Sequence, residues 1–339
     1  MKFVWGTLSL AIAAIGILLC RPDLTEYTST LALSTPLAQI ISMRFWIGAG
    51  LIFSALLLAI FAVVRRKLLN MGRIAGALAA MLAVCGVLQF GVMLERGLAN
   101  PGKLGPDHGI TATARGNGDI TVLTYNTLGG KTTPGQIAQL AEANGADVIV
   151  LAETAGDRGH ELVRLLAKRG LRFQHFDTAT SKYDPEFRST ILLISETLGK
   201  YEQSDTAPAE AAAVSARPVA GNGPEIVGVH PIAPMPRFVD SWRKQTRSVY
   251  ELCSRPNIIV AGDFNSTIDH QLAQGFTCGD GAKDAGSGAV GTWPVNTPAT
   301  LSAPIDRVLY SGSFRGADAA IVTVGGSDHR GLLVRLSTK

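Results

Sequence analysis

Two short acidic motifs carry residue types that can do hydrolytic chemistry: GDFN at 262–265 and SDH at 327–329. The apolar, β-branched run 257–261 has the length of a buried strand, and the chain breaks at Gly262 just before Asp263 and Asn265. Side chains two apart in an extended exit point to the same side, so one can hold a water while the other holds a ligand oxygen. This geometry suits attack on a phosphoester. The alternative is an Asx turn that only closes the strand.

More polar side chains stand at the ends of strand-like apolar runs in the same way, namely Asn126, Glu153, His230, Asp306, Asp328 and His329. Taken singly, Glu153 could be the acid that begins a helix, and His230 could be a hydrogen-bonded core histidine. Taken together, these positions favour one fold that gathers the strand ends into a single site.

The motifs resemble, in kind and in order, those of the endonuclease/exonuclease/phosphatase superfamily, which includes deoxyribonuclease I, apurinic endonucleases, neutral sphingomyelinases and inositol polyphosphate 5-phosphatases. The resemblance covers 119 to about 337 and rests on TYN at 124–126, DVIVLAE at 147–153, the histidine at 230, GDFN, PIDRVL around Asp306, and SDH. It implies an α/β fold of the deoxyribonuclease I type, in which two mixed β-sheets pack as a sandwich flanked by helices.

The resemblance also implies a divalent metal, usually Mg²⁺ and in some cases Mn²⁺. Glu153 would hold the ion, with Asn126 nearby and Asp328 able to contribute. Oxygen ligands of this kind suit a hard cation.

The remaining site residues take catalytic roles by the same resemblance. Asp263 would position or deprotonate the attacking water, and Asn265 would hold a phosphate oxygen. His329, oriented by Asp306, would stabilise charge on the phosphorus together with His230.

Two positions depart from the commonest pattern of the superfamily. Ala152 stands where many members have glutamine, and Arg307 stands where histidine or tyrosine is frequent. Neither change removes a catalytic group. Arg307 alone does not show to which branch of the superfamily the chain would belong.

Three uncharged apolar runs, at 3–20, 45–64 and 74–93, are each long enough to span a bilayer. A buried helix of a soluble protein is the alternative, and three such runs in the first hundred residues favour a membrane anchor.

Basic residues crowd the loop between the second and third runs, namely Arg65, Arg66, Lys67 and Arg73. The excess of basic residues in cytoplasmic loops predicts a multi-pass cell-membrane protein with a cytoplasmic N-terminus and an extracytoplasmic catalytic domain. A cleaved first run would leave this orientation unchanged.

Charge is distributed unevenly along the chain. Residues 1–96 hold 8 basic and 3 acidic residues, a net of +5, whereas residues 97–339 hold 23 basic and 24 acidic residues, a net of −1. The domain beyond the anchor therefore lacks the broad basic surface of a protein that grips long nucleic acid. The expected partners are the lipid bilayer and a lipid-linked or cell-envelope phosphoester. The sequence identifies no protein partner.

The sequence thus predicts a membrane-anchored, metal-dependent phosphoester hydrolase, more specifically a phosphodiesterase. An extracellular metal-dependent nuclease is one alternative, and a catalytically silent sensor of phosphorylated ligands is another.

The predicted organisation has three parts: the anchor 1–96, a Gly/Pro-rich tether 97–118 and the catalytic domain 119–339. Cys253 and Cys278 are the two cysteines of the domain. Since an oxidising compartment permits a bridge, we hypothesise that they form a disulfide.

Overall fold

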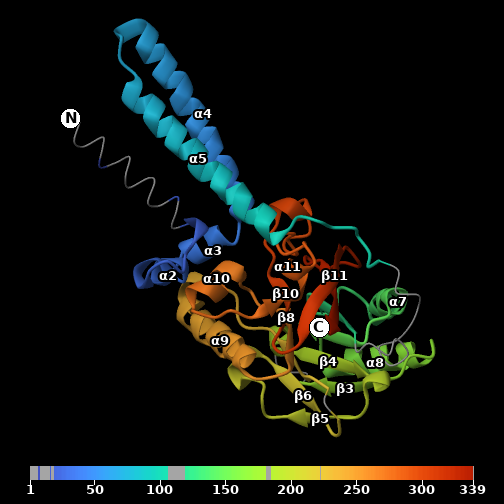
Figure 1. The fold of residues 1–339 in the computed structure, drawn as a ribbon. Coiled ribbons are helices and arrows are strands. Elements are labelled where there is room, and N and C mark those ends of the chain that lie inside the picture. Colours follow the sequence, from blue (N-terminus) through green and yellow to red (C-terminus); the bar gives the residue numbers. More distant parts are fainter. Residues whose placement is uncertain are drawn as a thin grey trace.

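The computed structural model describes residues 19–105, 119–180, 185–221 and 223–338, together with Thr7 and Gly16. The chain forms a body of two sheets with helices outside them, and a long helical hairpin projects from this body (Figure 1).

The hairpin consists of α4 (Arg44–Leu69) and α5 (Arg73–Arg96). Within the described residues, these two helices are long and apolar enough to cross a membrane. Only 17% of the most apolar stretch of α4 and 33% of that of α5 is buried, so most of this apolar surface has no partner among the described residues. The runs expected at 45–64 and 74–93 are therefore confirmed as apolar helices. Nearly all of the run 3–20 lies outside the described residues.

A tight turn closes the hairpin at its far end. Asn70 ends α4 in the left-handed conformation, and Gly72 has a φ of 146°. A Cβ atom on Gly72 would lie 2.4 Å from the carbonyl oxygen of Ala62, so only glycine fits there. This turn, with its basic residues, lies at the end of the hairpin away from the sheets (Figure 1).

Two short helices before the hairpin, α2 (Glu26–Ala32) and α3 (Leu37–Ile41), pack on the body next to α10 (Ile268–Ala273). The Nε2 atom of His270 donates a hydrogen bond to the carbonyl of Ala38 over 3.0 Å. The N-terminal segment is thus attached to the two-sheet body by direct contacts.

A buried ion cluster joins the hairpin to α10. Asp269 accepts hydrogen bonds from Arg44 and Arg96, the first residue of α4 and the last residue of α5. The Nε atom of Arg44 lies 2.9 Å from Oδ2, and Arg96 makes two contacts of 2.7 Å. Burial alone would raise the pKa of the Asp269 carboxyl, but the two arginines lower that pKa well below its usual range. The carboxylate is therefore charged and shared by both helices.

We expect the folded protein to lose roughly 3 kcal/mol of stability as the pH falls from 6.5 to 4, because His270 must stay neutral. Burial lowers the pKa of His270 to about 4 in spite of the neighbouring Asp269. Its Nδ1 atom accepts from the backbone N–H of Thr267 at 2.9 Å, which only an unprotonated nitrogen can do. The folded state thus binds fewer protons than the unfolded chain, so the loss begins below pH 6.5.

Thermal unfolding of the full-length protein between pH 7 and 4.5 measures this effect. In a His270→Gln variant, the decline of the Tm with falling pH should be shallower. An equal decline in both proteins would show that another group is responsible.

The first sheet has six strands in the order β11–β12–β1–β2–β4–β3. In that order, their bounds are Phe314–Val322, Gly331–Thr338, Ile120–Asn126, Val148–Ala152, Thr190–Ser195 and Phe173–Asp177. Strands β1 and β2 are parallel, and the other neighbours are antiparallel.

The second sheet also has six strands, in the order β5–β6–β7–β8–β10–β9. Their bounds are Tyr201–Ser204, Val214–Pro218, Glu225–Val229, Ile258–Asp263, Asp306–Tyr310 and Gly279–Asp280. Here β7 and β8 form the parallel pair. Both sheets are mixed, as predicted.

The main core lies between the sheets, where apolar side chains from both meet in one cluster that includes Val122, Val150, Ile226, Ile259 and Val308. Continuous β-branched and apolar runs form these strands because both of their faces are covered. The predicted sandwich is confirmed.

Helices cover the outer faces of the sandwich. The first sheet packs against α7 (Pro134–Asn144) and α8 (Gly156–Ala167), and the second packs against α9 (Val239–Glu251). Thr133 caps the N-terminus of α7, and Gly145 ends the helix in the left-handed conformation. One further short helix is α11 (Gly281–Asp284), and the 3₁₀ turns are Glu186–Arg188, Glu196–Leu198, Ala209–Ala211, Pro236–Phe238, Leu252–Ser254 and Ala299–Leu301.

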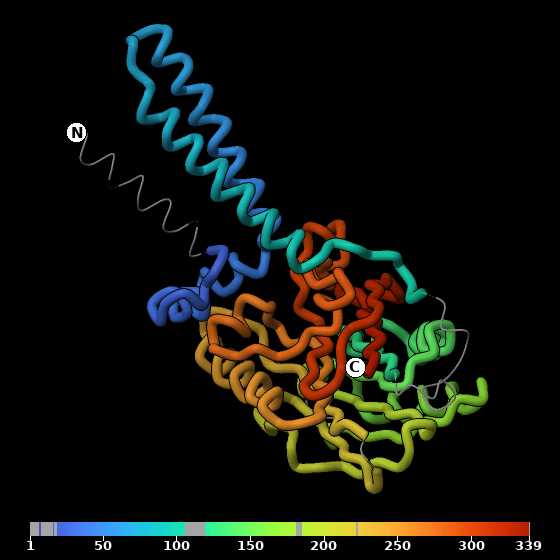
Figure 2. The backbone as a smooth tube through the Cα atoms, in the orientation of Figure 1, coloured from blue at the N-terminus to red at the C-terminus, as the bar shows by residue number. Residues whose placement is uncertain are grey.

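The chain after α5 runs along the body, as Figure 2 shows. Ala99 donates its backbone N–H to Gly286 at 3.0 Å, and the side chain of Asn100 accepts from the backbone of Ile321 at 3.1 Å. These contacts fix residues 97–105 on the domain. The rest of the predicted tether lies outside the described residues.

Cys253 and Cys278 form a disulfide, which confirms the pairing hypothesised from the sequence. The bridge links the turn after α9 to the segment before β9. It therefore closes the stretch of chain that contains the GDFN motif.

Candidate active site

The strand pairing brings the polar ends of the strands together. The parallel pairs β1–β2 and β7–β8 end at the same edge of the sandwich, and β10 begins where β8 ends because Asp306 pairs with Asp263. The SDH motif precedes β12, which runs antiparallel to β1. Seven of the predicted residues line one cavity of about 1480 Å³, namely Asn126, Glu153, His230, Asp263, Asn265, Asp328 and His329.

Asn126 lies between two carboxylates at the base of the cavity. Its Nδ2 atom donates to Glu153 over 3.0 Å and to Asp263 over 3.1 Å, and its Oδ1 atom accepts from the backbone of Leu128. Glu153 has a φ of 52°, a conformation that costs energy for a residue with a side chain. The amide of Asn126 thus holds both acids in place.

The GDFN turn is fixed by its backbone. Gly262 has a φ of 152°, and a Cβ atom there would lie 2.0 Å from the carbonyl oxygen of Val229. Asp263 accepts from the backbone N–H of Asn265 at 2.8 Å through Oδ1, so the Asx turn considered for this motif does form. The turn leaves Oδ2 of Asp263 facing the cavity residues. The Nδ2 atom of Asn265 donates to the carbonyl of Pro231 over 3.0 Å.

Two histidines flank Oδ2 of Asp263, and the Nε2 atom of each lies 3.6 Å from it. His230 donates from Nδ1 to the carbonyl of Phe187 at 2.8 Å, so its Nε2 atom faces the cavity. The Nδ1 atom of His329 lies 2.8 Å from Asp306, which is buried behind it. Each imidazole is therefore oriented through its Nδ1 atom.

His329 carries a positive charge at neutral pH. Burial alone would lower its pKa, but Asp306 and Asp263 outweigh burial and raise the pKa to about 9. Burial also raises the pKa of Asp306, so the two groups compete for one proton. We assign this proton to His329, because Asp328 also favours the imidazolium. A cation thus stands beside Asp263.

The SDH motif has a separate structural role for each residue. Ser327 donates to the carbonyl of Asn126 at 2.7 Å and accepts from the backbone of His329 at 3.1 Å. Asp328 accepts from the indole of Trp293 at 3.0 Å through Oδ2. Trp293 is 38% exposed and lines the cavity.

The donors at the cavity base fit a divalent cation. Glu153 and Asp328 offer carboxylate oxygens, and Oδ1 of Asp328 is a buried atom with no hydrogen-bond partner among the described residues. The ligand atoms of Asp263, Asp306 and His329 also lie within 4.8 Å of one another. Because Asp306 and His329 already bond each other, Glu153 and Asp328 have more freedom to hold an ion.

Arg307, the departure noted in the sequence, lies away from the cavity. Its guanidinium is buried and donates to Asp280, Tyr250 and Gln271. Successive side chains of a strand point to opposite faces, so Asp306 reaches the site while Arg307 supports the outer layer.

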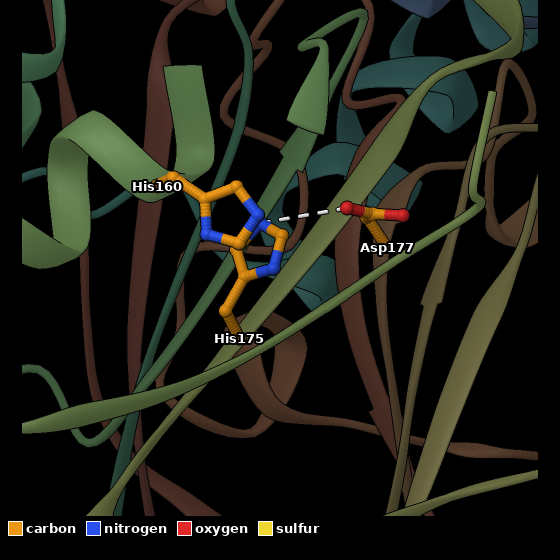
Figure 3. Close-up of side chains that lie close together, drawn as sticks. All are labelled: His160, His175 and Asp177. Atoms are coloured by element: carbon orange, nitrogen blue, oxygen red, sulfur yellow. Dashed lines mark ion pairs between the residues drawn. The ribbon is translucent and has the colours of Figure 1, made fainter. Parts of the chain in front are cut away.

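A second group of possible metal ligands joins α8 to β3, as Figure 3 shows. The rings of His160 and His175 stack with centroids 4.1 Å apart, and Nε2 of His175 lies 3.7 Å from Asp177. A Cβ atom on Gly159 would lie 2.4 Å from that nitrogen, so the glycine makes room for the ring. The group therefore packs the helix on the edge strand. No sequence motif had pointed to it.

Sequence reasoning missed one wall of the cavity, which is formed by Gln39, Ser42 and Met43 from the N-terminal segment. Thr178, Thr180 and Phe187 line another part. These residues belong to no motif. Only the folded chain brings them to the site.

Comparisons with known proteins agree with the family resemblance. The sequence profile described as the endonuclease/exonuclease/phosphatase family matches residues 123–329. The comparison with curated proteins finds no match.

Several solved structures are similar to this chain. A humanized D. rerio TDP2 with 14 mutations has 14% identity and a TM-score of 0.49, covering 65% of this chain and 99% of its own. An endonuclease/exonuclease/phosphatase from Beutenbergia cavernae DSM 12333 has 17% identity and a TM-score of 0.49, with 65% and 72% covered. TDP2 from C. elegans has 14% identity and a TM-score of 0.45, with 84% and 93% covered.

The matched residues 123–329 make up more than half of the chain and contain the eight predicted site residues. A buried Asp/His cluster, formed by Asp263, Asp306 and His329, lies within that match. The chain is thus a phosphoester hydrolase, and it belongs to the endonuclease/exonuclease/phosphatase family, whose members are typically metal-dependent.

Proposed function

We propose that this protein is a membrane-anchored, divalent-metal-dependent phosphodiesterase that acts outside the cytoplasm on a lipid-linked or cell-envelope phosphate. The observation that carries the proposal is the position of the cavity: the catalytic carboxylates share it with Met43, the residue directly before α4. The cavity therefore adjoins the apolar hairpin. Because we propose that this hairpin crosses the membrane, the cavity lies close to the membrane surface, and the substrate comes from there.

In the proposed reaction, Asp263 orients the attacking water and takes its proton as the water oxygen bonds to phosphorus. The bond between phosphorus and the leaving oxygen breaks, and that oxygen leaves as an alcohol after it takes up a proton. The carboxylate is suited to this role because Asn126 and the backbone of Asn265 fix it from two sides. His329 and His230, both beside Asp263, stabilise negative charge on the phosphoryl oxygens. Asn265 holds one of these oxygens.

Glu153 and Asp328, with Asn126 beside them, would hold Mg²⁺ or Mn²⁺. When bound there, the ion would neutralise charge on the phosphate and on the leaving oxygen. Activation of the water and binding of the phosphate oxygens are carried out by Asp263, Asn265 and the two histidines.

The arrangement of the hairpin supports the proposed orientation. Arg66 and Lys67 lie in the last turn of α4, at the end away from the catalytic body, as expected for a cytoplasmic loop. Exposed aromatic side chains, Tyr27 and Trp46, lie near the opposite end. Such residues are typical of the interface between membrane and water.

A substrate panel tests the proposal with the full-length protein in nanodiscs, with Mg²⁺ or Mn²⁺ added. The panel contains phospholipids, DNA, RNA and nitrophenyl phosphodiesters, and Glu153→Ala is the inactive comparison. We expect metal-dependent turnover of a lipid phosphodiester that is lost in the variant. Cleavage of DNA without lipid turnover would instead identify a nuclease, and metal-independent binding without turnover would identify a sensor.

A further inference from the structure

One wall of the active-site cavity comes from outside the catalytic domain. Gln39, Ser42 and Met43 line the cavity together with Asp263 and His329, although they precede the family match by about 80 residues. The matched domain alone would leave this side of the cavity open. The Gln39–Met43 segment, which directly precedes α4, is therefore part of the site.

Several independent contacts hold this wall in place. Asp269 binds Arg44, the residue that follows Met43, and His270 donates to Ala38. Trp46 donates from its indole to the carbonyl of Leu301 at 3.0 Å. Since these contacts lie on both sides of the cavity-lining residues, the wall has a fixed position relative to the catalytic carboxylates.

The surface of the cavity changes in character from its base to its rim. The base carries carboxylates and imidazoles, whereas the sides carry apolar side chains, namely Met43, Phe187, Ile232, Met235 and Phe238. Phe187 and Met235 are 50% and 46% exposed. Large apolar side chains that stay exposed around a cavity indicate a ligand with an apolar part.

The apolar part of the cavity lining that includes Met43 adjoins the part of the chain that faces lipid in the proposed orientation. Met43 directly precedes α4, and Ile40 and Trp46, on either side of it, are 42% and 50% exposed. A hydrocarbon chain that follows this surface can reach the cavity without crossing water. Its phosphate then lies at the polar base.

We infer that the Gln39–Met43 segment is a substrate subsite that selects phosphoesters carrying a hydrocarbon chain drawn from the bilayer. This inference rests on the proposed function, because it assigns the chain-bearing part of the same substrate. The phosphate contacts the acids and histidines, and the chain lies against Met43 and Met235, which line the same cavity.

Two synthetic diesters with the same leaving group separate the subsite from the chemistry. These are 4-nitrophenyl methyl phosphate and 4-nitrophenyl dodecyl phosphate, each given to the full-length protein in nanodiscs with Mg²⁺. Met43→Gln keeps the length of the side chain but removes its apolar character. We expect this change to lower the ratio of kcat/KM for dodecyl over methyl ester about tenfold, the effect of losing one apolar contact of this size.

Met71→Gln is the matched control, because Met71 is exposed in the far turn of the hairpin and does not line the cavity. Its ratio should equal that of the wild type. Met235→Gln, at another apolar residue of the cavity lining, repeats the test if Met43→Gln does not fold, as judged by circular dichroism and Tm. A ratio unchanged in the folded variants would overturn the inference.

Binding of dodecyl phosphate and methyl phosphate, measured by calorimetry, gives a second readout that needs no turnover. Preference for the dodecyl compound that depends on Met43, without hydrolysis of either ester, would refute the proposed function and support the subsite. Metal-dependent hydrolysis of both esters without any chain preference would support the function and refute the subsite.

Discussion

Replacing Asp263 with asparagine is expected to lower kcat by roughly a hundredfold to ten-thousandfold while leaving the fold intact. Asparagine has the same shape, but it cannot accept the proton of the attacking water. The carboxylate is buried, and its Oδ2 atom lies 3.6 Å from each of two imidazoles, so no other acid occupies the same position between them. Initial rates at saturating Mg²⁺ on whichever phosphodiester the panel identifies measure the effect.

Asp205→Asn is the control for this prediction. Asp205 is exposed in the turn between β5 and β6 and lies outside the cavity lining. Its kcat should match the wild type. If Asp263→Asn kept more than a tenth of the wild-type kcat, the base would have to be His230, because His329 already carries its proton.

Replacing Asp269 with alanine is expected to cost about 3–5 kcal/mol of stability, because two buried arginines would lose their common partner. The loss should separate the Gln39–Met43 wall from the domain as well as lowering the Tm. Thermal unfolding measures the first effect, and the dodecyl-to-methyl ratio measures the second.

Two comparisons sharpen this test. Asp23→Ala removes a carboxylate from Arg21 at the surface, where 60% of the arginine side chain is exposed, and should cost less than about 1 kcal/mol. Changing Asp269 to leucine together with Arg44 and Arg96 to methionine should restore much of the lost stability, since no buried charge then lacks a partner. A cost below about 1 kcal/mol for Asp269→Ala would mean that the arginines find other partners or water.

The residues that the sequence singled out lie together around one cavity, and each of them has a local signal. Asp263 comes directly after Gly262, which has a positive φ and stands at the end of a buried apolar run. Glu153 comes directly after the apolar strand β2. The helix that begins at Pro134 could be predicted in the same way, from its cap. The disulfide could be hypothesised because the domain has only two cysteines.

The wall at Gln39–Met43 and its attachment through Asp269 had no comparable signal. Asp269 is separated from Arg44 by 225 positions, and no spacing or periodicity relates such distant residues. In the sequence, Asp269 is one more acid in the first turn of a short helix. The contact between Trp293 and Asp328 has no local signal either, because the two residues lie 35 positions apart.

By itself, the sequence determined the family, the two mixed sheets and the class of hydrolase, because strand periodicity and short motifs are properties of neighbouring residues. Only the tertiary structure decided that the N-terminal segment closes the cavity and that the hairpin is fixed to the domain. Those features depend on pairs of charges and apolar surfaces that meet across more than 200 residues. Such pairs exist only once the chain has folded.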